Sequence, residues 1–122
     1  MFLKTQITAI GPDVADLLDG GVLILFAEGA PPELAEVSIL HKVISIDETQ
    51  PTIGAKIKIG NLEAKITAIG DYAWKKVIDI GHVVINFNNA SKAERPGEIC
   101  ATDLDAAALL RALNIGQTIS IS

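Results

Sequence analysis

The chain has 122 residues, 49% of them apolar and 20% charged, which fits one compact domain spanning residues 1–122 and excludes a disordered protein. The net charge of −5 argues against binding to a nucleic-acid backbone and suits a basic protein partner, although the same acidity also favours solubility. No apolar run is long enough to cross a bilayer, no signal peptide is expected and the single cysteine makes no internal disulfide, so we predict a cytoplasmic protein.

The first half of the chain, residues 1–60, alternates short strands with one helix. Gly20-Gly21 ends the short helical segment, and a polar loop rich in Gly, Pro and Glu separates the second strand from the third. At the end of this half, Gly60-Asn61 lies between two runs of alternating apolar and charged residues, which predicts a two-residue hairpin. The expected elements are strand 2–10, helix 12–18, strand 22–26, loop 28–36, strand 37–43 and strand 53–59.

The second half, residues 61–122, repeats motifs of the first half in the same order. Three ordered matches at an interval of about 60 residues indicate an internal duplication, since one short match could arise by chance. The matching segments are residues 7–11 and 66–70 (Ile-Thr-Ala-Ile-Gly in both), residues 22–26 and 83–87, and residues 53–59 and 115–121 (Ile-Gly-x-x-Ile-x-Ile in both).

Two helices are expected in the second half. One spans residues 71–80, with Asp71 as its N-cap and Gly81 as its stop, and the other spans residues 104–113. Two related β-rich halves of this size bury their faces poorly alone, and closing them around a pseudo-twofold axis removes exposed strand edges. We therefore predict a mostly β protein, a small closed β-barrel with an internal pseudo-twofold duplication and two or three short helices. An open α/β sandwich is the alternative.

His41 is the strongest candidate for a reactive side chain. It lies on a predicted strand just after a loop that contains Glu28, Gly29 and two prolines, and backbone N–H groups at such a turn can face an anion. The repeat places Ala101 or Thr102 at the matching position, so the scaffold does not need a histidine there. An ordinary core or rim histidine is the competing interpretation.

The remaining reactive side chains suggest structural roles. His82 follows Gly81, where a histidine past a helix end can hydrogen-bond the last carbonyls, and it can support His41 if the barrel brings both to one rim. Cys100 is expected to be a buried apolar residue, because the sequence shows neither the base nor the electropositive setting of a thiolate nucleophile. Two separated histidines and one cysteine are too few for a zinc site, so we expect no metal and no cofactor.

Five segments carry a resemblance to a known family, namely residues 7–11, 26–34, 66–70, 81–83 and 93–97, together with His41. In this combination they resemble the glucitol/sorbitol-specific enzyme IIA component of the bacterial sugar phosphotransferase system, over essentially the whole chain. The Glu-Gly-Ala-Pro loop followed by His41, with Gly-His-Val at residues 81–83, is specific as a set, whereas any one of these pieces alone is weak. Family members can carry a second histidine shortly after the first, whereas Lys42 follows here, so His41 is the only candidate in its segment.

The resemblance implies a phosphotransferase that acts as a phosphocarrier, with a small six-stranded barrel as its fold. Such a protein takes a phosphoryl group from the histidine-containing carrier HPr and passes it to a cysteine of the cognate IIB component during sugar uptake. The family's phospho-accepting histidine falls at His41. The sequence leaves a homodimer open, and the alternative function is a non-catalytic β-barrel module that binds a small ligand or a protein.

The implied mechanism assigns a role to each neighbour of His41. We expect Nε2 of His41 to be the nucleophile, with Nδ1–H held by a backbone carbonyl or by the carboxylate of Glu28. Backbone N–H groups near Gly29 and the ammonium group of Lys42 are expected to bind the phosphoryl oxygens, and His82 is expected to be a nearby hydrogen-bonding partner.

Overall fold

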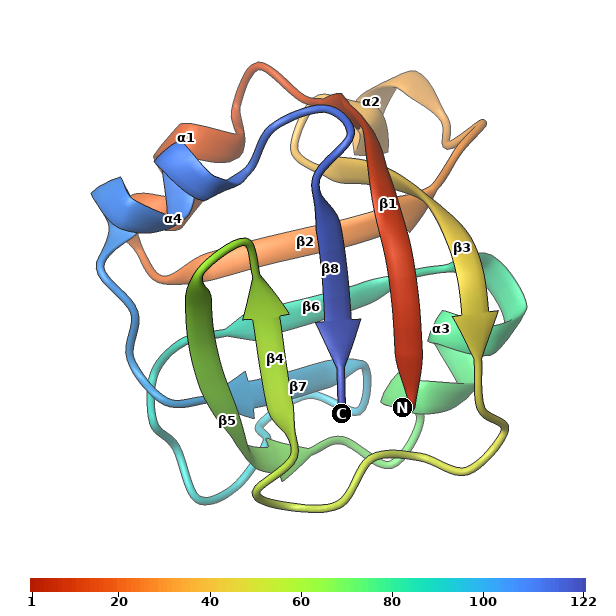
Figure 1. Ribbon diagram of the computed structural model, residues 1–122, viewed down its shortest axis with the longest axis vertical. Helices are drawn as coiled ribbons and strands as arrows, with labels where there is room; N and C mark the ends of the chain where they lie inside the picture. Colours follow the sequence, from red (N-terminus) through yellow and green to blue (C-terminus); the bar gives the residue numbers. More distant parts are fainter.

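A computed structural model describes all of residues 1–122. Eight strands form one closed barrel in the order β1-β3-β2-β6-β7-β5-β4-β8, and four short helices lie outside it (Figure 1). None of the helices has the length and apolarity needed to cross a membrane. The elements are β1 (Leu3–Ile10), α1 (Val14–Asp19), β2 (Val22–Ala27), α2 (Pro32–Ala35), β3 (Ile39–Ile46), β4 (Lys56–Ile59), β5 (Leu62–Ile69), α3 (Ala73–Ile80), β6 (Val83–Asn86), β7 (Glu98–Ala101), α4 (Ala106–Ala112) and β8 (Thr118–Ile121).

The predicted closed barrel is confirmed, although it has eight strands where the family resemblance implied six, and four helices where two or three were expected. Four of the eight strands are short, since β4, β6, β7 and β8 have four residues each. The extra helix is the single turn α2, which begins at Pro32 and which the sequence analysis placed in a loop. Closure joins the two ends of the chain, because Leu3 of β1 pairs with Ile121 of β8 and both termini lie at one end of the barrel (Figure 1).

The two halves of the barrel have the same local geometry. In the first half Ile7 pairs with His41, and in the second half Ile66 pairs with Ala101. Both pairings are followed by a register shift, and both contain a buried threonine hydroxyl without a hydrogen-bond partner, at Thr8 and at the equivalent threonine 59 residues later (67 − 8). These correspondences support the proposal that residues 1–60 and 61–122 are duplicated halves of one domain.

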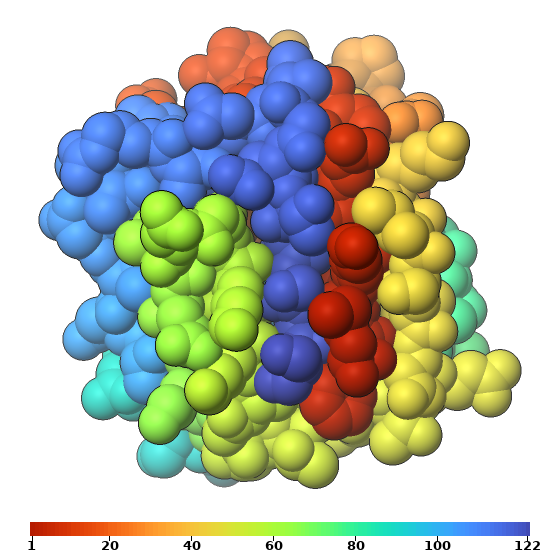
Figure 2. All heavy atoms as spheres, in the orientation of Figure 1, coloured from red at the N-terminus to blue at the C-terminus, as the bar shows by residue number.

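Strand alternation fills the barrel with isoleucine. Along β4, Ile57 and Ile59 are buried while Lys56 and Lys58, which alternate with them, are exposed, as expected when successive side chains point to opposite faces. The predicted hairpin is present, because Ile59 pairs with Leu62 across a two-residue turn in which Gly60 has a φ of +58°. Figure 2 shows the outer surface of β8, β1 and β3, which lie side by side without an opening between them.

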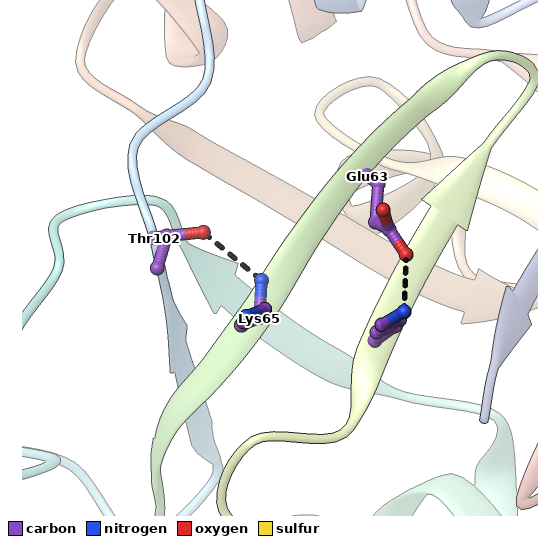
Figure 3. A network of polar contacts seen from close by, with 4 residues as sticks. Glu63, Lys65 and Thr102 are labelled. Carbon is purple, nitrogen blue, oxygen red and sulfur yellow. Dashed lines mark hydrogen bonds and ion pairs between the residues drawn. The ribbon is translucent and has the colours of Figure 1, made fainter.

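Polar contacts on the outer face reinforce the edge where β5 meets β4 and β7 (Figure 3). Lys56 and Glu63 form an exposed ion pair at 3.4 Å, a type of pair that adds little stability. The hydroxyl of Thr102 accepts a hydrogen bond from the backbone N–H of Lys65 at 2.9 Å, and the backbone N–H of Thr102 donates to the carbonyl of Lys65 at 2.9 Å. The two hydrogen bonds between Lys65 and Thr102 therefore extend the β5–β7 ladder one residue past the end of β7.

Helix α3 covers the end of the barrel beside β3 (Figure 1). Its C-cap is Gly81 in the left-handed conformation, as the sequence predicted. Its N-cap is Tyr72 without a side-chain hydrogen bond, so the prediction of Asp71 as N-cap is wrong. The indole N–H of Trp74 donates to the carbonyl of Asp47 at 2.8 Å, which ties the first turn of α3 to the chain that leaves β3. At the other end of α3, Gly81 packs closely against Ala27 of β2.

Candidate functional site

A shallow depression of about 310 Å³ lies between β3, the end of β2 and the C-terminal half of α3. Its rim is partly apolar, since Ile78 and Ile80 of α3 are 42% and 46% exposed. It also carries charge of both signs, from Glu28, Lys42 and Asp79. We call it the His41 depression; its lining residues are Ala27, Glu28, His41, Lys42, Val43, Val77, Ile78, Asp79, Ile80 and Gly81.

His41 is one of the residues that line this depression. His41 lies in β3, opposite Ile7 of β1 on one side and Ala27 of β2 on the other, and its side chain points into the barrel. The residue is only 1% exposed. Its Nδ1 lies 2.6 Å from Oγ1 of Thr5, and its Nε2 lies 2.6 Å from the carbonyl oxygen of Gly81. Both ring nitrogens therefore have a partner within the protein.

These two contacts define the tautomer of His41. A carbonyl oxygen only accepts hydrogen bonds, so the contact with Gly81 requires a proton on Nε2. Burial lowers the pKa of His41 below its ordinary value of 6.5, with partial opposition from the Gly81 hydrogen bond, so the ring is neutral at pH 7. In the neutral ring Nδ1 is bare and accepts a hydrogen bond from the hydroxyl of Thr5. This arrangement is the reverse of the expected one, in which a carbonyl or Glu28 held Nδ1–H and Nε2 was bare.

Glu28 does not orient the ring. Its side chain is exposed, while the ring of His41 points inward, so the carboxylate stays on the rim of the His41 depression. Only the backbone N–H of Glu28 contacts His41, by donating to its carbonyl at 3.2 Å. Lys42 is exposed and lines the depression. Gly29 has a φ of +85° in the turn after β2 and lies outside the lining residues.

His82 occupies a different environment from His41. Its Nδ1 donates to the carbonyl of Leu25 at 3.0 Å, because that oxygen can only accept, and its ring is tilted against Phe26 with centroids 4.8 Å apart. The expected contact with the last helix carbonyls is made by its backbone N–H, which donates to Lys76 at 3.2 Å. The ring lines a separate depression and makes no hydrogen bond to His41. It anchors the peptide whose carbonyl holds Nε2 of His41.

Sequence reasoning missed Thr5 and Gly81 as the partners of His41. Gly81 had been recognised as a helix stop, but the direction of its carbonyl depends on the tertiary fold. Thr5 did carry a signal, because it alternates with Leu3 and Ile7 on the face of β1 that points inward. A polar residue at a core position needs a hydrogen-bond partner, and His41 is the partner here.

Cys100 has the inert environment that the sequence suggested. The residue is 0% exposed, and its thiol donates to Oε1 of Glu98 at 3.1 Å. Burial, together with this hydrogen bond and the charge of Glu98, raises the pKa of the Cys100 thiol to about 12. Since the thiolate is the reactive form, Cys100 is not a nucleophile near neutral pH. No group of three or more His, Cys, Asp or Glu side chains is arranged to hold a metal ion.

Cys100 should therefore react with iodoacetamide at pH 8 at least about a hundredfold more slowly in the native protein than in the unfolded chain. Unfolding in guanidinium exposes the thiol and returns its pKa to the ordinary range, which restores the thiolate. Mass spectrometry of the alkylated protein over time measures both rates. Equal rates in the two states would contradict the buried, carboxylate-bonded environment.

The fold and the sequence both match known proteins. A solved structure from Enterococcus faecalis V583, described as a PTS system IIA component, has a TM-score of 0.79 at 23% identity and covers 96% of this chain and 97% of that one, which shows a shared fold. A family model described as the PTS system glucitol/sorbitol-specific IIA component matches residues 2–120. The chain is also 33% identical over 98 residues to glucitol/sorbitol-specific EIIA components of Escherichia coli (strain K12) and Shigella flexneri, over 79% of this chain and 77% of each relative.

The protein thus has the barrel fold of a phosphotransferase-system IIA component. Within that class, it belongs to the glucitol/sorbitol-specific IIA family, which confirms the resemblance found in the sequence.

Proposed function

We propose that this protein is a cytoplasmic phosphocarrier that accepts a phosphoryl group from phospho-HPr on His41 and passes it to a glucitol/sorbitol-type IIB component. The observation that carries the proposal is a neutral histidine, His41, among the residues that line a partly apolar depression on the surface. Membership of the IIA family supplies the class of reaction. The competing function is a non-catalytic binding module, and one observation favours it: His41 is buried with both ring nitrogens hydrogen-bonded.

Transfer to His41 requires a bare ring nitrogen and an open path to it. The ring is neutral because burial disfavours the charged form, and its bare nitrogen at rest is Nδ1, so Nε2 has to lose its proton before it can accept the group. A nucleophilic histidine forms a covalent phosphoramidate, which divides one difficult transfer into two easier ones. The transition state is loose, so positioning and charge stabilisation dominate. Lys42 on the rim and the backbone N–H groups near Gly29 are the groups assigned to the phosphoryl oxygens.

The corner between α3 and β6 covers Nε2 of His41. Gly81 at this corner both lines the depression and accepts the hydrogen bond from Nε2. Exposing Nε2 requires this bond to break and the corner to move, which also loosens the hydrogen bonds that His82 makes to the carbonyls of Leu25 and Lys76. In this proposal, the partner docks against Ile78 and Ile80 and this docking moves the corner.

The surface around the depression suits a basic partner with apolar contacts. Ile78 and Ile80 offer exposed apolar area, as the core of a protein interface requires. Glu28, Glu33 and Glu36 are exposed on the segment that precedes β3. Carboxylates at such a rim speed the encounter with a basic surface of HPr.

Peptide mapping tests the phosphocarrier assignment. Trypsin separates the two histidines, because His41 lies in the fragment of residues 5–42 and His82 in the fragment of residues 77–92. After incubation with phospho-HPr and digestion at alkaline pH, where phosphohistidine survives, the phosphoryl group should be found on the fragment of residues 5–42. A phosphoryl group on residues 77–92 would move the role to His82. The absence of phosphate on either fragment would overturn the carrier function in favour of a binding module.

A further inference from the structure

Thr5 is a buried polar residue with a single hydrogen-bond partner. It is 0% exposed and lies between Leu3 and Ile7 on the inward face of β1. The only hydrogen bond of its hydroxyl group is the 2.6 Å contact with Nδ1 of His41. Burying a hydroxyl among apolar side chains is unfavourable unless it is hydrogen-bonded. The burial of Thr5 therefore depends on its hydrogen bond to His41.

The second half of the barrel shows that the fold does not require the pair. Ile7 opposite His41 corresponds to Ile66 opposite Ala101. Thr5 lies two residues before Ile7, and the residue two before Ile66 is an alanine that is 1% exposed. At the equivalent place the barrel thus closes with two buried alanines in the positions of the hydroxyl and the imidazole. The pair in the first half adds polar chemistry to a scaffold that also works without it.

The two hydrogen-bonding partners of the His41 ring differ in which protonation state of the ring nitrogen they accept. The carbonyl of Gly81 accepts only, so it is compatible with a protonated Nε2 alone. The hydroxyl of Thr5 rotates about its Cβ–Oγ1 bond, so it can donate to a bare Nδ1 or accept from a protonated Nδ1. Thr5 is therefore the one partner that can stay bonded when the proton changes nitrogen.

We propose that Thr5 is a positioning residue that holds His41 in both of its tautomers and so allows Nε2 to become the nucleophile. In the resting protein, Nε2–H donates to Gly81 and Thr5 donates to Nδ1. In the transferring state, the Gly81 carbonyl has moved away, Nδ1–H donates to Thr5 and Nε2 is bare. This inference rests on the proposed phosphocarrier function of His41.

Protons and electrons balance in this sequence of steps. The proton on Nε2 leaves to water when the contact with Gly81 opens, and a proton from water adds to Nδ1. The lone pair of Nε2 then forms the N–P bond, while the P–N bond of phospho-HPr breaks and the donor nitrogen keeps its electron pair. The product ring bears the phosphoryl group on Nε2 and a proton on Nδ1, and Thr5 accepts from that N–H. The same contact makes the ring a better leaving group for transfer to the thiol of the IIB component.

Two substitutions separate the hydroxyl of Thr5 from its shape. Thr5→Val keeps the branched shape and removes the hydroxyl, whereas Thr5→Ser keeps the hydroxyl and removes a methyl group. We expect Thr5→Val to accept the phosphoryl group from phospho-HPr about tenfold or more slowly than the unaltered protein, the effect of losing a hydrogen bond to a charged group. Thr5→Ser should restore most of the rate. Thermal melting of both variants verifies that they are folded.

Nitrogen NMR of histidine-labelled protein shows which ring nitrogen of His41 carries the proton. A purely structural role of Thr5 would not change this result, so it is an independent test. In the free protein the proton of His41 should be on Nε2, and in the phosphoprotein at the same pH it should be on Nδ1. Thr5→Val should lose the protonated Nδ1 of the phosphoprotein, and Thr5→Ser should retain it. A folded Thr5→Val protein with an unchanged rate and an unchanged Nδ1–H signal would overturn the role of Thr5 and leave the phosphocarrier function intact. A failure of the unaltered protein to become phosphorylated on His41 would instead remove the function on which the role rests.

Discussion

Replacement of His41 by glutamine should abolish the uptake of a labelled phosphoryl group from phospho-HPr. An amide nitrogen has no lone pair comparable to that of imidazole, so no phosphoramidate can form at position 41. The glutamine amide can still donate to the carbonyl of Gly81, so the barrel should remain folded. Incubation with catalytic phospho-HPr and labelled donor, followed by quantification of protein-bound label, measures the effect, and the expected value for His41→Gln is background.

His82→Gln is the matched control, because it makes the same substitution at the chain's only other histidine. The ring of His82 faces a separate depression and bonds to Leu25, so its loss should leave labelling of His41 within about tenfold of normal. A moderate reduction is expected, since His82 follows the Gly81 carbonyl that contacts the His41 ring. If His82→Gln lost all label while His41→Gln kept it, the two roles would have to be exchanged.

The architecture of the barrel was predictable because the sequence repeats itself. Three ordered matches, including Ile-Thr-Ala-Ile-Gly at residues 7–11 and 66–70, imply two related halves, and related halves rich in strands are stabilised by closing on each other. The structure confirms the closed barrel. The count of six strands came from the family resemblance, and the structure has eight.

The candidate site was only half predictable. His41 stands out by its residue type and its position after a Pro-containing loop, which local sequence shows. Its ring partners lie 36 residues before it, at Thr5, and 40 residues after it, at Gly81. Both are brought to His41 by the pairing of β1 with β3 and by the packing of α3 at the end of the barrel. No local pattern contains the direction of the Gly81 carbonyl, so Glu28, a carboxylate of the preceding loop, was given the orienting role instead.

Gly70→Ala should strongly destabilise the protein. Among the glycines without a left-handed backbone, only the counterpart change Gly11→Ala should have an effect as large. A methyl group at position 70 would overlap the backbone carbonyl of Pro96 and come within 2.5 Å of the carbonyl oxygen of Arg95, and one at position 11 would lie 2.6 Å from the carbonyl carbon of Glu36. These neighbours are backbone atoms, so the strand or the loop has to shift. We expect a loss of about 3 kcal/mol in the free energy of unfolding, measured by urea denaturation, as typical of overpacking.

The same clash explains why the glycine closes the repeated Ile-Thr-Ala-Ile-Gly motif in each half. At both places the strand end crosses the loop that leads into its partner strand, β3 for Gly11 and β7 for Gly70, and the Gly11 N–H donates to the carbonyl of Ser38 and the Gly70 N–H to that of Glu98. Gly20→Ala is the control, since a Cβ there would meet only the Leu17 carbonyl at 3.5 Å and the backbone is not left-handed. Its stability should stay within about 1 kcal/mol of normal. Equal losses at positions 20 and 70 would show that alanine lowers stability through general backbone effects and that the crossing does not demand glycine.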